Sequence, residues 1–113
     1  MKASTFQDCV RRTANIDLNT QQQLTNACMG IAGESGEFVD LIKKALFHGH
    51  TLDFTKAKSE LGDILYYVAW AADALGLNLD DVMECNVAKL LKRYPNGFNS
   101  ADSIKRVDVG DSK

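Results

Sequence analysis

Apolar side chains recur three and four residues apart along most of the chain, between short polar breaks that contain glycine or proline. This spacing is typical of amphipathic helices. It predicts a short first helix, capped by Ser4 or Thr5, and three longer ones, over Thr5–Arg12, Leu18–Leu46, Asp53–Leu75 and Leu79–Tyr94. No segment has the strict alternation of a half-buried strand, so the pattern predicts an all-α fold with a four-helix core bundle.

Glycines mark the expected ends of two helices and interrupt one of them. Gly49 is expected to end the second helix in a left-handed conformation, and Gly76 is expected to stop the third. Three more glycines lie inside the second helix, where each costs about 1 kcal/mol relative to alanine. Their clustering predicts a kink or a close approach by another group, at Gly30, Gly33 and Gly36.

The composition is that of a packed globular domain, except at the C-terminal end. The chain has 113 residues, of which 45% are hydrophobic and one is proline. After Phe98 it becomes polar and charged, with only isolated apolar positions. We therefore expect one helical domain over residues 1–98 and a polar C-terminal tail over residues 99–113, either mobile or laid on a neighbouring subunit.

Charge and hydropathy exclude several classes of partner. Thirteen basic and fifteen acidic residues give a net charge of −2, so no general attraction to duplex nucleic acid is expected. The longest uncharged apolar run, Ile64–Ala72, has nine residues, whereas a membrane span needs roughly 20. Asp8 interrupts the N-terminal segment before an apolar signal core develops, so we expect a cytoplasmic protein.

Three cysteines are spaced too widely for a disulfide framework or a zinc site of the CxxC type. We expect all of them to be reduced structural thiols, at Cys9, Cys28 and Cys85.

Two pairs of carboxylates at helical spacing carry the candidate chemistry. Glu34 and Glu37 are three residues apart in the second predicted helix, and Glu60 and Asp63 are three apart in the third. Each pair therefore projects from one face of its helix. At about 100° per residue, Glu34 falls inside the apolar stripe and Glu60 at the margin of its own. A carboxylate in such a place must be protonated or compensated by a cation.

The donor type indicates which cation the four acids prefer. Oxygen ligands without a cysteine or histidine pair favour Mg²⁺ or Mn²⁺ over zinc, and such sites often include substrate phosphate. The acids therefore predict a divalent metal site used in phosphate chemistry. The alternative is that both acidic pairs lie on solvated helix faces.

A polar stripe on the fourth predicted helix is a second candidate for binding phosphate. Asn86, Lys89 and Arg93 share one face of that helix, and basic side chains aligned in this way suit phosphate oxygens. A solvated helix face produces the same pattern, so the stripe alone leaves both interpretations open.

Basic and imidazole side chains gather near the end of the second predicted helix. Lys43 and Lys44 suit the negative end of its dipole. His48 and His50 lack further ligands at matching spacing, so we expect a capping or surface role for them rather than a metal site.

An aromatic group makes the third predicted helix apolar almost all round. Tyr66, Tyr67 and Trp70 lie away from its main apolar stripe. A helix of this kind is buried on both sides, which predicts a subunit interface. The alternative is that one ring stacks on a nucleotide base.

The chain resembles the MazG-like nucleotide pyrophosphohydrolases over roughly residues 20–98. The resemblance rests on two acidic pairs with 22 residues between them and on a C-terminal motif, namely Gly33-Glu34-Ser35-Gly36-Glu37, Glu60-Leu61-Gly62-Asp63, and Asn86 with KLLKRYPNGF at Lys89–Phe98. It implies the all-α NTP pyrophosphohydrolase fold in a homodimer or homotetramer. It also implies Mg²⁺-dependent hydrolysis of nucleoside triphosphates to the monophosphate and pyrophosphate.

The resemblance also assigns roles to individual residues. It implies that the metal ligands are Glu34, Glu37, Glu60 and Asp63. It places four further residues near the phosphates or sugar of the substrate: Asn86, Lys89, Arg93 and Tyr94.

Many relatives carry a further glutamate where this chain has Gly33, so the motif does not identify a general base. Glu37 lies nearest the polar edge, and we consider it the candidate to orient or deprotonate the attacking water.

Other functions fit the same motifs. A related helical pyrophosphohydrolase could act on a specialised nucleotide, as a dUTPase-like enzyme or on phosphoribosyl-ATP. A non-catalytic helical oligomerisation module could carry the same acids on solvated faces. The preferred base and sugar depend on pocket shape, which one sequence does not fix.

Overall fold

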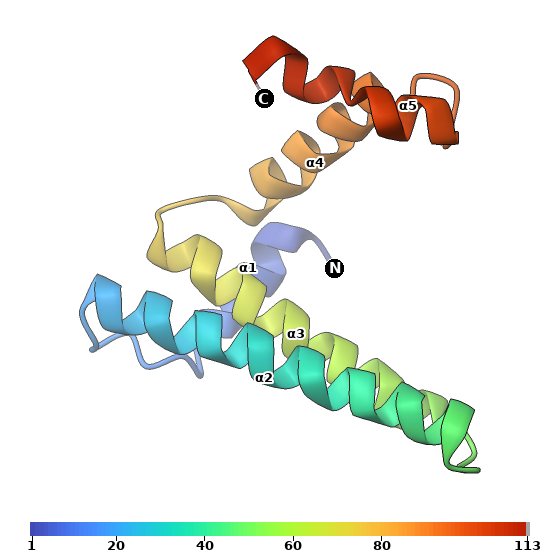
Figure 1. Cartoon of the computed structure of the whole chain (residues 1–113). Helices are drawn as coiled ribbons and strands as arrows, with labels where there is room; N and C mark the ends of the chain where they lie inside the picture. Colours follow the sequence, from blue (N-terminus) through green and yellow to red (C-terminus); the bar gives the residue numbers. More distant parts are fainter. Residues whose placement is uncertain (113) are drawn as a thin grey trace. The chain divides into compact units, whose positions relative to one another are not determined.

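The computed structural model describes residues 1–112, and no strand occurs among them. The helices follow in the order α1 (Ala3–Arg11), α2 (Thr20–Phe47), α3 (Phe54–Ala74), α4 (Leu79–Arg93) and α5 (Ser100–Lys105), followed by a 3₁₀ helix, η1 (Val107–Ser112) (Figure 1). The predicted all-α fold is confirmed, and the first four helices begin and end within two residues of their predicted bounds.

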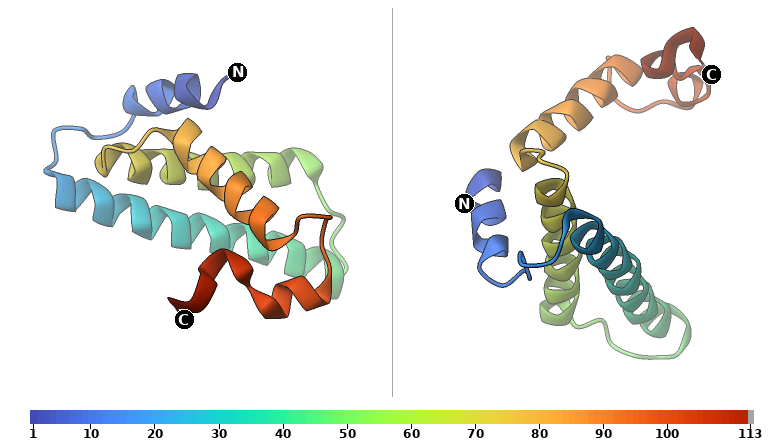
Figure 2. Two further views of the ribbon diagram at one scale, coloured as in Figure 1. Left: turned by 90° about the horizontal axis from the view of Figure 1, so that it is seen from above. Right: turned by 90° about the vertical axis from the view of Figure 1, so that its left-hand side faces the viewer.

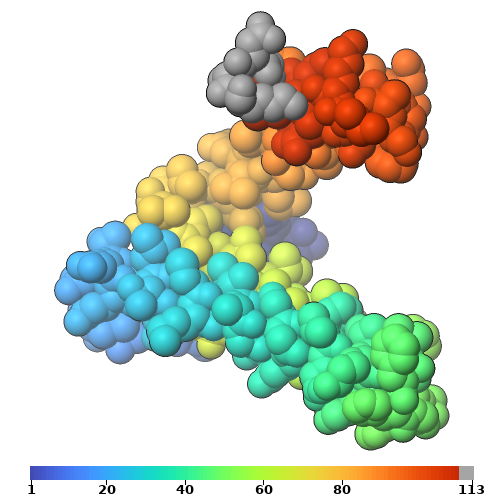
Figure 3. Space-filling view, viewed as in Figure 1, coloured from blue at the N-terminus to red at the C-terminus, as the bar shows by residue number. Residues whose placement is uncertain are grey.

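The residues form two compact units, Met1–Leu79 and the residues from Asp80 onward. In the first unit α2 and α3 lie antiparallel and side by side, and α1 lies against α3 on the side away from α2 (Figure 2). Side chains of α2 cover one face of this pair along its length (Figure 3). The core lies between α1, α2 and α3 and is built from Val10, Ala14, Ala27, Ala69, Trp70 and Leu79.

Polar contacts fix α1 to the end of α3. The buried Gln7 donates from Nε2 to the Leu77 carbonyl at 2.8 Å and accepts from the Leu79 N–H at 3.0 Å. Arg11 forms an ion pair with Asp73. The predicted Ser4 or Thr5 cap is wrong, because α1 begins at Ala3 and the residue at its N-cap, Lys2, makes no side-chain cap.

The aromatic group of α3 packs within the first unit. The Trp70 ring is buried and its Nε1 donates to Gln23 Oε1 at 3.0 Å, while the Tyr66 hydroxyl lies 2.8 Å from Thr13 Oγ1. The subunit-interface interpretation, and the alternative of base stacking, are wrong for Trp70. The physical reason is that side chains of the same chain already cover this face of α3.

Glycines have the two roles expected from the sequence. Gly49 and Gly76 have φ values of 75° and 72°, so both adopt the left-handed conformation after α2 and α3. Inside the continuous helix α2, a Cβ at Gly30 would overlap the ring of Tyr67, whereas one at Gly33 would meet nothing within 4 Å. The expected close approach therefore occurs at Gly30.

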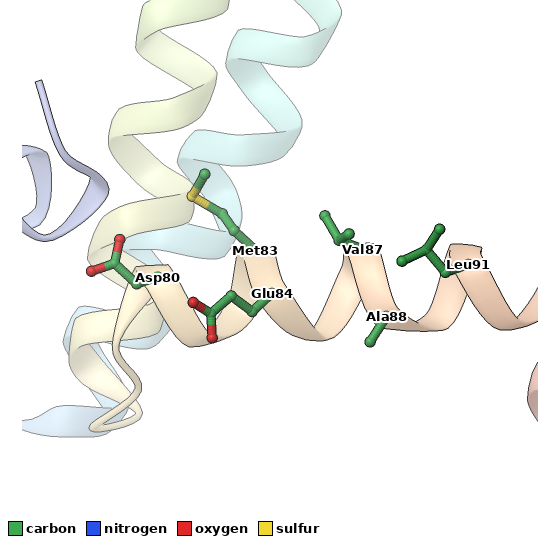
Figure 4. A pocket seen from close by; sticks show the side chains of 6 residues that line it. All are labelled: Asp80, Met83, Glu84, Val87, Ala88 and Leu91. Carbon is green, nitrogen blue, oxygen red and sulfur yellow. The ribbon is translucent and has the colours of Figure 1, made fainter.

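In the second unit, one side of α4 presents an apolar row. Met83, Val87 and Leu91 point to the same side (Figure 4). They border a groove of about 480 Å³ whose lining also includes Asp80, Glu84 and Ala88. These three apolar side chains are each more than half exposed in the single chain.

The chain is also helical beyond Phe98, where the sequence pattern predicts no helix. The Asn99 side chain caps α5 by accepting from the Asp102 N–H at 2.8 Å. Asp108 of η1 forms an ion pair with Arg93 of α4. The predicted domain boundary at residue 98 stays a prediction, and Lys113 of the predicted tail lies outside the described residues.

Within residues 1–112, none of the helices combines the length and the apolar character that a membrane span requires.

Candidate metal centre

Three of the four predicted metal ligands meet between α2 and α3. Glu34 and Glu37 project from α2 and Glu60 projects from α3, and one carboxylate oxygen of each lies within 4.8 Å of the others. Asp63 lies one turn beyond Glu60 and is exposed. It is outside this tight group, but its charge contributes to the raised pKa of Glu34. The structure therefore brings three of the acids together and leaves Asp63 at the margin. The role of all four as metal ligands stays a prediction.

Two of these carboxylates have oxygens that are shielded from water and lack a partner. Glu34 Oε2 and Glu60 Oε2 are both buried and accept no hydrogen bond within the described part of the chain. A buried carboxylate oxygen is normally paired with a donor or a cation. Oxygen donors from three acids are the ligand set that Mg²⁺ and Mn²⁺ prefer, so these residues fit a divalent metal ion.

The proximity of the acids changes their protonation. Removal from water, followed by the nearby Glu37 carboxyl, raises the pKa of Glu34 from 4.5 to about 7. The same two causes raise the pKa of Glu60. The acids are therefore held together against their mutual repulsion, which a bound cation would relieve.

The raised pKa of Glu34 predicts a pH-dependent stability. In metal-free protein the unfolded chain releases the Glu34 proton near pH 4.5 and the folded chain near pH 7. The free energy of unfolding should therefore fall as pH rises through this interval, because the unfolded state becomes ionised first. We expect Glu34→Gln to match the wild type in melting temperature near pH 4 and to exceed it at pH 8.

Thermal melts in EDTA at both pH values measure this effect. Added Mg²⁺ at pH 8 should raise the melting temperature of the wild type more than that of Glu34→Gln. An identical pH dependence of the melting temperature for the two proteins would contradict a raised pKa of Glu34.

A cleft of about 300 Å³ opens next to the acids. It is lined by Glu37, Asp40, Leu41, Lys44, Lys56 and Glu60. Lys44 Nζ lies 2.9 Å from Asp40 Oδ2, and this contact lowers the pKa of Asp40. The sequence interpretation limited Lys44 to a helix-dipole role and missed Lys56, although Lys56 stands four residues before Glu60.

The predicted substrate residues all lie on or just after α4, in the second unit. Asn86 and Lys89 are exposed. Arg93 donates from Nε and Nη2 to the two carboxylate oxygens of Asp108, each at 2.8 Å, and these hydrogen bonds hold the pKa of Asp108 well below its usual value. Tyr94 packs next to Phe98, with ring centroids 5.4 Å apart. The role of these four residues in substrate binding stays a prediction.

Two comparisons with known proteins found a match. Residues 21–98 match the family model described as the MazG nucleotide pyrophosphohydrolase domain. The "Gene 37 protein" of Mycobacterium phage L5 is 32% identical over 85 residues, which cover 72% of this chain and 75% of that protein. No solved structure matches the chain. The matched range contains the four acids and the predicted substrate residues.

Proposed function

Because this chain belongs to the MazG nucleotide pyrophosphohydrolase family, we propose that it hydrolyses nucleoside or deoxynucleoside triphosphates to the monophosphate and pyrophosphate. The observation that carries the proposal is the meeting of Glu34, Glu37 and Glu60, two of which, Glu34 and Glu60, each have a buried oxygen without a partner. We place the activity in the cytoplasm, where it would remove unwanted nucleotides from the pool.

The four acids would hold Mg²⁺, or Mn²⁺ in its place: Glu34, Glu37, Glu60 and Asp63. The bound cation supplies positive charge that offsets the charge developing on the phosphate oxygens. Water attacks the α-phosphorus in line, and a new P–O bond forms as the bond to pyrophosphate breaks. Glu37 is exposed at the cleft, so its carboxylate can orient this water and accept its proton.

Polar side chains on α4 and just after it would bind the substrate. Asn86, Lys89 and Tyr94 offer hydrogen bonds to phosphate or sugar oxygens. Arg93 donates to Asp108 at present, so binding a phosphate would require it to exchange one anionic partner for another. We propose all four residues, Arg93 included, as substrate ligands, because each offers hydrogen-bond donors and all lie in the range that matches the family.

We also propose that the chain forms a homodimer or homotetramer. Support comes from a hollow of about 430 Å³ on the C-terminal half of α2, lined by Phe38, Val39, Ile42, Lys43, Leu46 and Phe47. Phe47 is 77% exposed in the single chain. A second copy would remove this apolar surface from water, and a monomeric mass by light scattering would contradict the proposal.

Product analysis on a nucleotide panel tests the function. Purified full-length protein is incubated with standard and modified NTPs and dNTPs, including dUTP, in Mg²⁺ or in EDTA. We expect Mg²⁺-dependent formation of equal amounts of monophosphate and pyrophosphate. Release of single phosphate would indicate a different phosphatase chemistry. No turnover by folded protein would favour a non-catalytic module.

A further inference from the structure

The segment after α4 returns a carboxylate to the end of that helix. Arg93 donates from Nε and Nη2 to the two carboxylate oxygens of Asp108, each at 2.8 Å. Arg106 Nε lies 3.6 Å from Oδ1 of the same carboxylate. Two parallel hydrogen bonds from one guanidinium are the geometry in which arginine binds either a carboxylate or a phosphate. Asp108 therefore fills an anion site that Arg93 and Arg106 form.

The contact between Arg93 and Asp108 is largely shielded from water. The Asp108 side chain is 3% exposed and the Arg93 side chain is 16% exposed. The hydrogen bonds from Arg93 also hold the pKa of Asp108 well below its usual value, so the carboxylate stays charged. Another anion can therefore accept the same two hydrogen bonds from Arg93 only if Asp108 leaves.

Asp108 does not satisfy every donor of this site. Arg106 Nε is buried and has no hydrogen-bond partner within the described part of the chain, since 3.6 Å to Asp108 Oδ1 is too long for a hydrogen bond. A buried donor is normally paired. A terminal phosphate group has three acceptor oxygens and more negative charge than a carboxylate, so it could accept hydrogen bonds from both guanidinium groups.

The segment that carries Asp108 is held mainly by polar contacts. None of the α5 residues, all of which the structure describes, is buried, and Ile104 is 82% exposed. Arg106 follows α5 with a φ of 53°, a left-handed conformation that is unfavourable for a residue other than glycine. The ion pairs of Asp108 offset this cost. An anion that replaces Asp108 would therefore also release the turn at Arg106.

Building on the proposed function, we propose that Arg93 and Arg106 form a phosphate site that Asp108 occupies until a phosphate group of the nucleotide displaces it. The η1 segment then competes with the substrate for Arg93. Arg106 and Asp108 both follow residue 98, where the match to the family ends, so the competitor lies outside the matched domain. A ligand binds more weakly in proportion to the fraction of its sites that are free. Removing the Asp108 charge should therefore strengthen phosphate binding.

Titration with inorganic tripolyphosphate, followed by NMR of the ¹⁵N-labelled full-length protein, tests this displacement without turnover. EDTA is present so that no metal ion contributes to binding. In the wild type, the amide signals of α5 and η1 should move toward random-coil positions as tripolyphosphate is added. In Asp108→Asn they should lie there before the addition. Half-saturation of the Arg93 Nε–H signal should then need about tenfold less tripolyphosphate, because the competing charge is gone.

Two further variants complete the titration. Asp81→Asn is the matched control, because it makes the same chemical change on an exposed residue of α4, and it should require tripolyphosphate within about twofold of the wild type. Arg106→Gln should weaken binding at Arg93 several-fold, since one of the two guanidinium groups is lost. With a hydrolysed nucleotide, Asp108→Asn should lower KM by about tenfold and retain kcat.

Two results would overturn the competition. They are wild-type signals of α5 and η1 that stay in place at high tripolyphosphate, and an Asp108→Asn protein that needs as much tripolyphosphate as the wild type. Failure of the competition is distinguishable from failure of the proposed function. Displacement of η1 by tripolyphosphate without nucleotide hydrolysis would support the site and refute the function, whereas hydrolysis with a KM insensitive to Asp108→Asn would refute the competition alone.

Discussion

Replacing Glu60 by glutamine is expected to reduce pyrophosphate release by about a thousandfold or more. Glu60 contributes one of the three oxygens that lie within 4.8 Å of one another. Its Oε2 is buried and accepts no hydrogen bond within the described residues. Glutamine keeps the shape of the side chain but removes the negative charge that holds the cation. Loss of several kcal/mol of electrostatic stabilisation in the transition state corresponds to a rate loss of this size.

The Glu60→Gln protein should nevertheless remain folded. Its carboxylate is under repulsion from Glu37, which contributes to its raised pKa, so the neutral side chain relieves strain in metal-free protein. Circular dichroism and thermal melting in EDTA should therefore match or exceed the wild type. The same loss of turnover with retained helicity is expected for Glu37→Gln and Asp63→Asn.

Glu84→Gln is the control for this experiment, because it makes the same chemical change on an exposed residue of α4 outside the cluster. It should leave turnover close to the wild-type value. Folded Glu60→Gln protein with full activity would refute the metal-site assignment, because turnover would then not need the Glu60 carboxylate.

The helices could be predicted closely because local signals mark them. The apolar periodicity of α2 and α3 extends over many turns, and Gly49 and Gly76 end these helices with positive φ values. α5 and η1 lack such periodicity. The ion pair between Arg93 and Asp108, fifteen residues apart, bridges α4 and η1, and a polar contact between separate elements leaves no pattern in the sequence.

The candidate site was predictable in its donors but not in its geometry. The spacing within each pair places Glu34 with Glu37 and Glu60 with Asp63, yet only the packing of α2 against α3 brings Glu60 to the α2 pair and leaves Asp63 at the margin. Lys56 was missed for the same reason. The four-residue spacing between Lys56 and Glu60 can be seen in the sequence. The cleft that they line, however, also includes Lys44 and Glu37 of α2, and it forms only when the two helices pack.

A close approach between α2 and α3 leads to the second large prediction. Gly30→Ala should lower the free energy of unfolding by about 1–2 kcal/mol. The new Cβ would overlap the Tyr67 ring at the atoms Cγ, Cδ1 and Cε1. Rotation of the Tyr67 ring would not remove the overlap, because Cγ is bonded directly to the Tyr67 Cβ and moves little when the ring rotates. The two helices must therefore separate locally. Overpacking of this kind costs about 1–3 kcal/mol, which outweighs the helix propensity gained, about 1 kcal/mol at most.

Gly33→Ala supplies the opposite expectation on the same helix, one turn away. Nothing lies within 4 Å of its added Cβ, so the substitution should raise stability by up to about 1 kcal/mol. Urea unfolding followed by circular dichroism compares the two variants with the wild type. In the double variant Gly30→Ala with Tyr67→Leu, the cost of the new methyl group should shrink, because the ring that it meets has been removed. Equal stability of Gly30→Ala and Gly33→Ala would contradict close packing at this crossing, and with it the packing that brings Glu60 to Glu34 and Glu37.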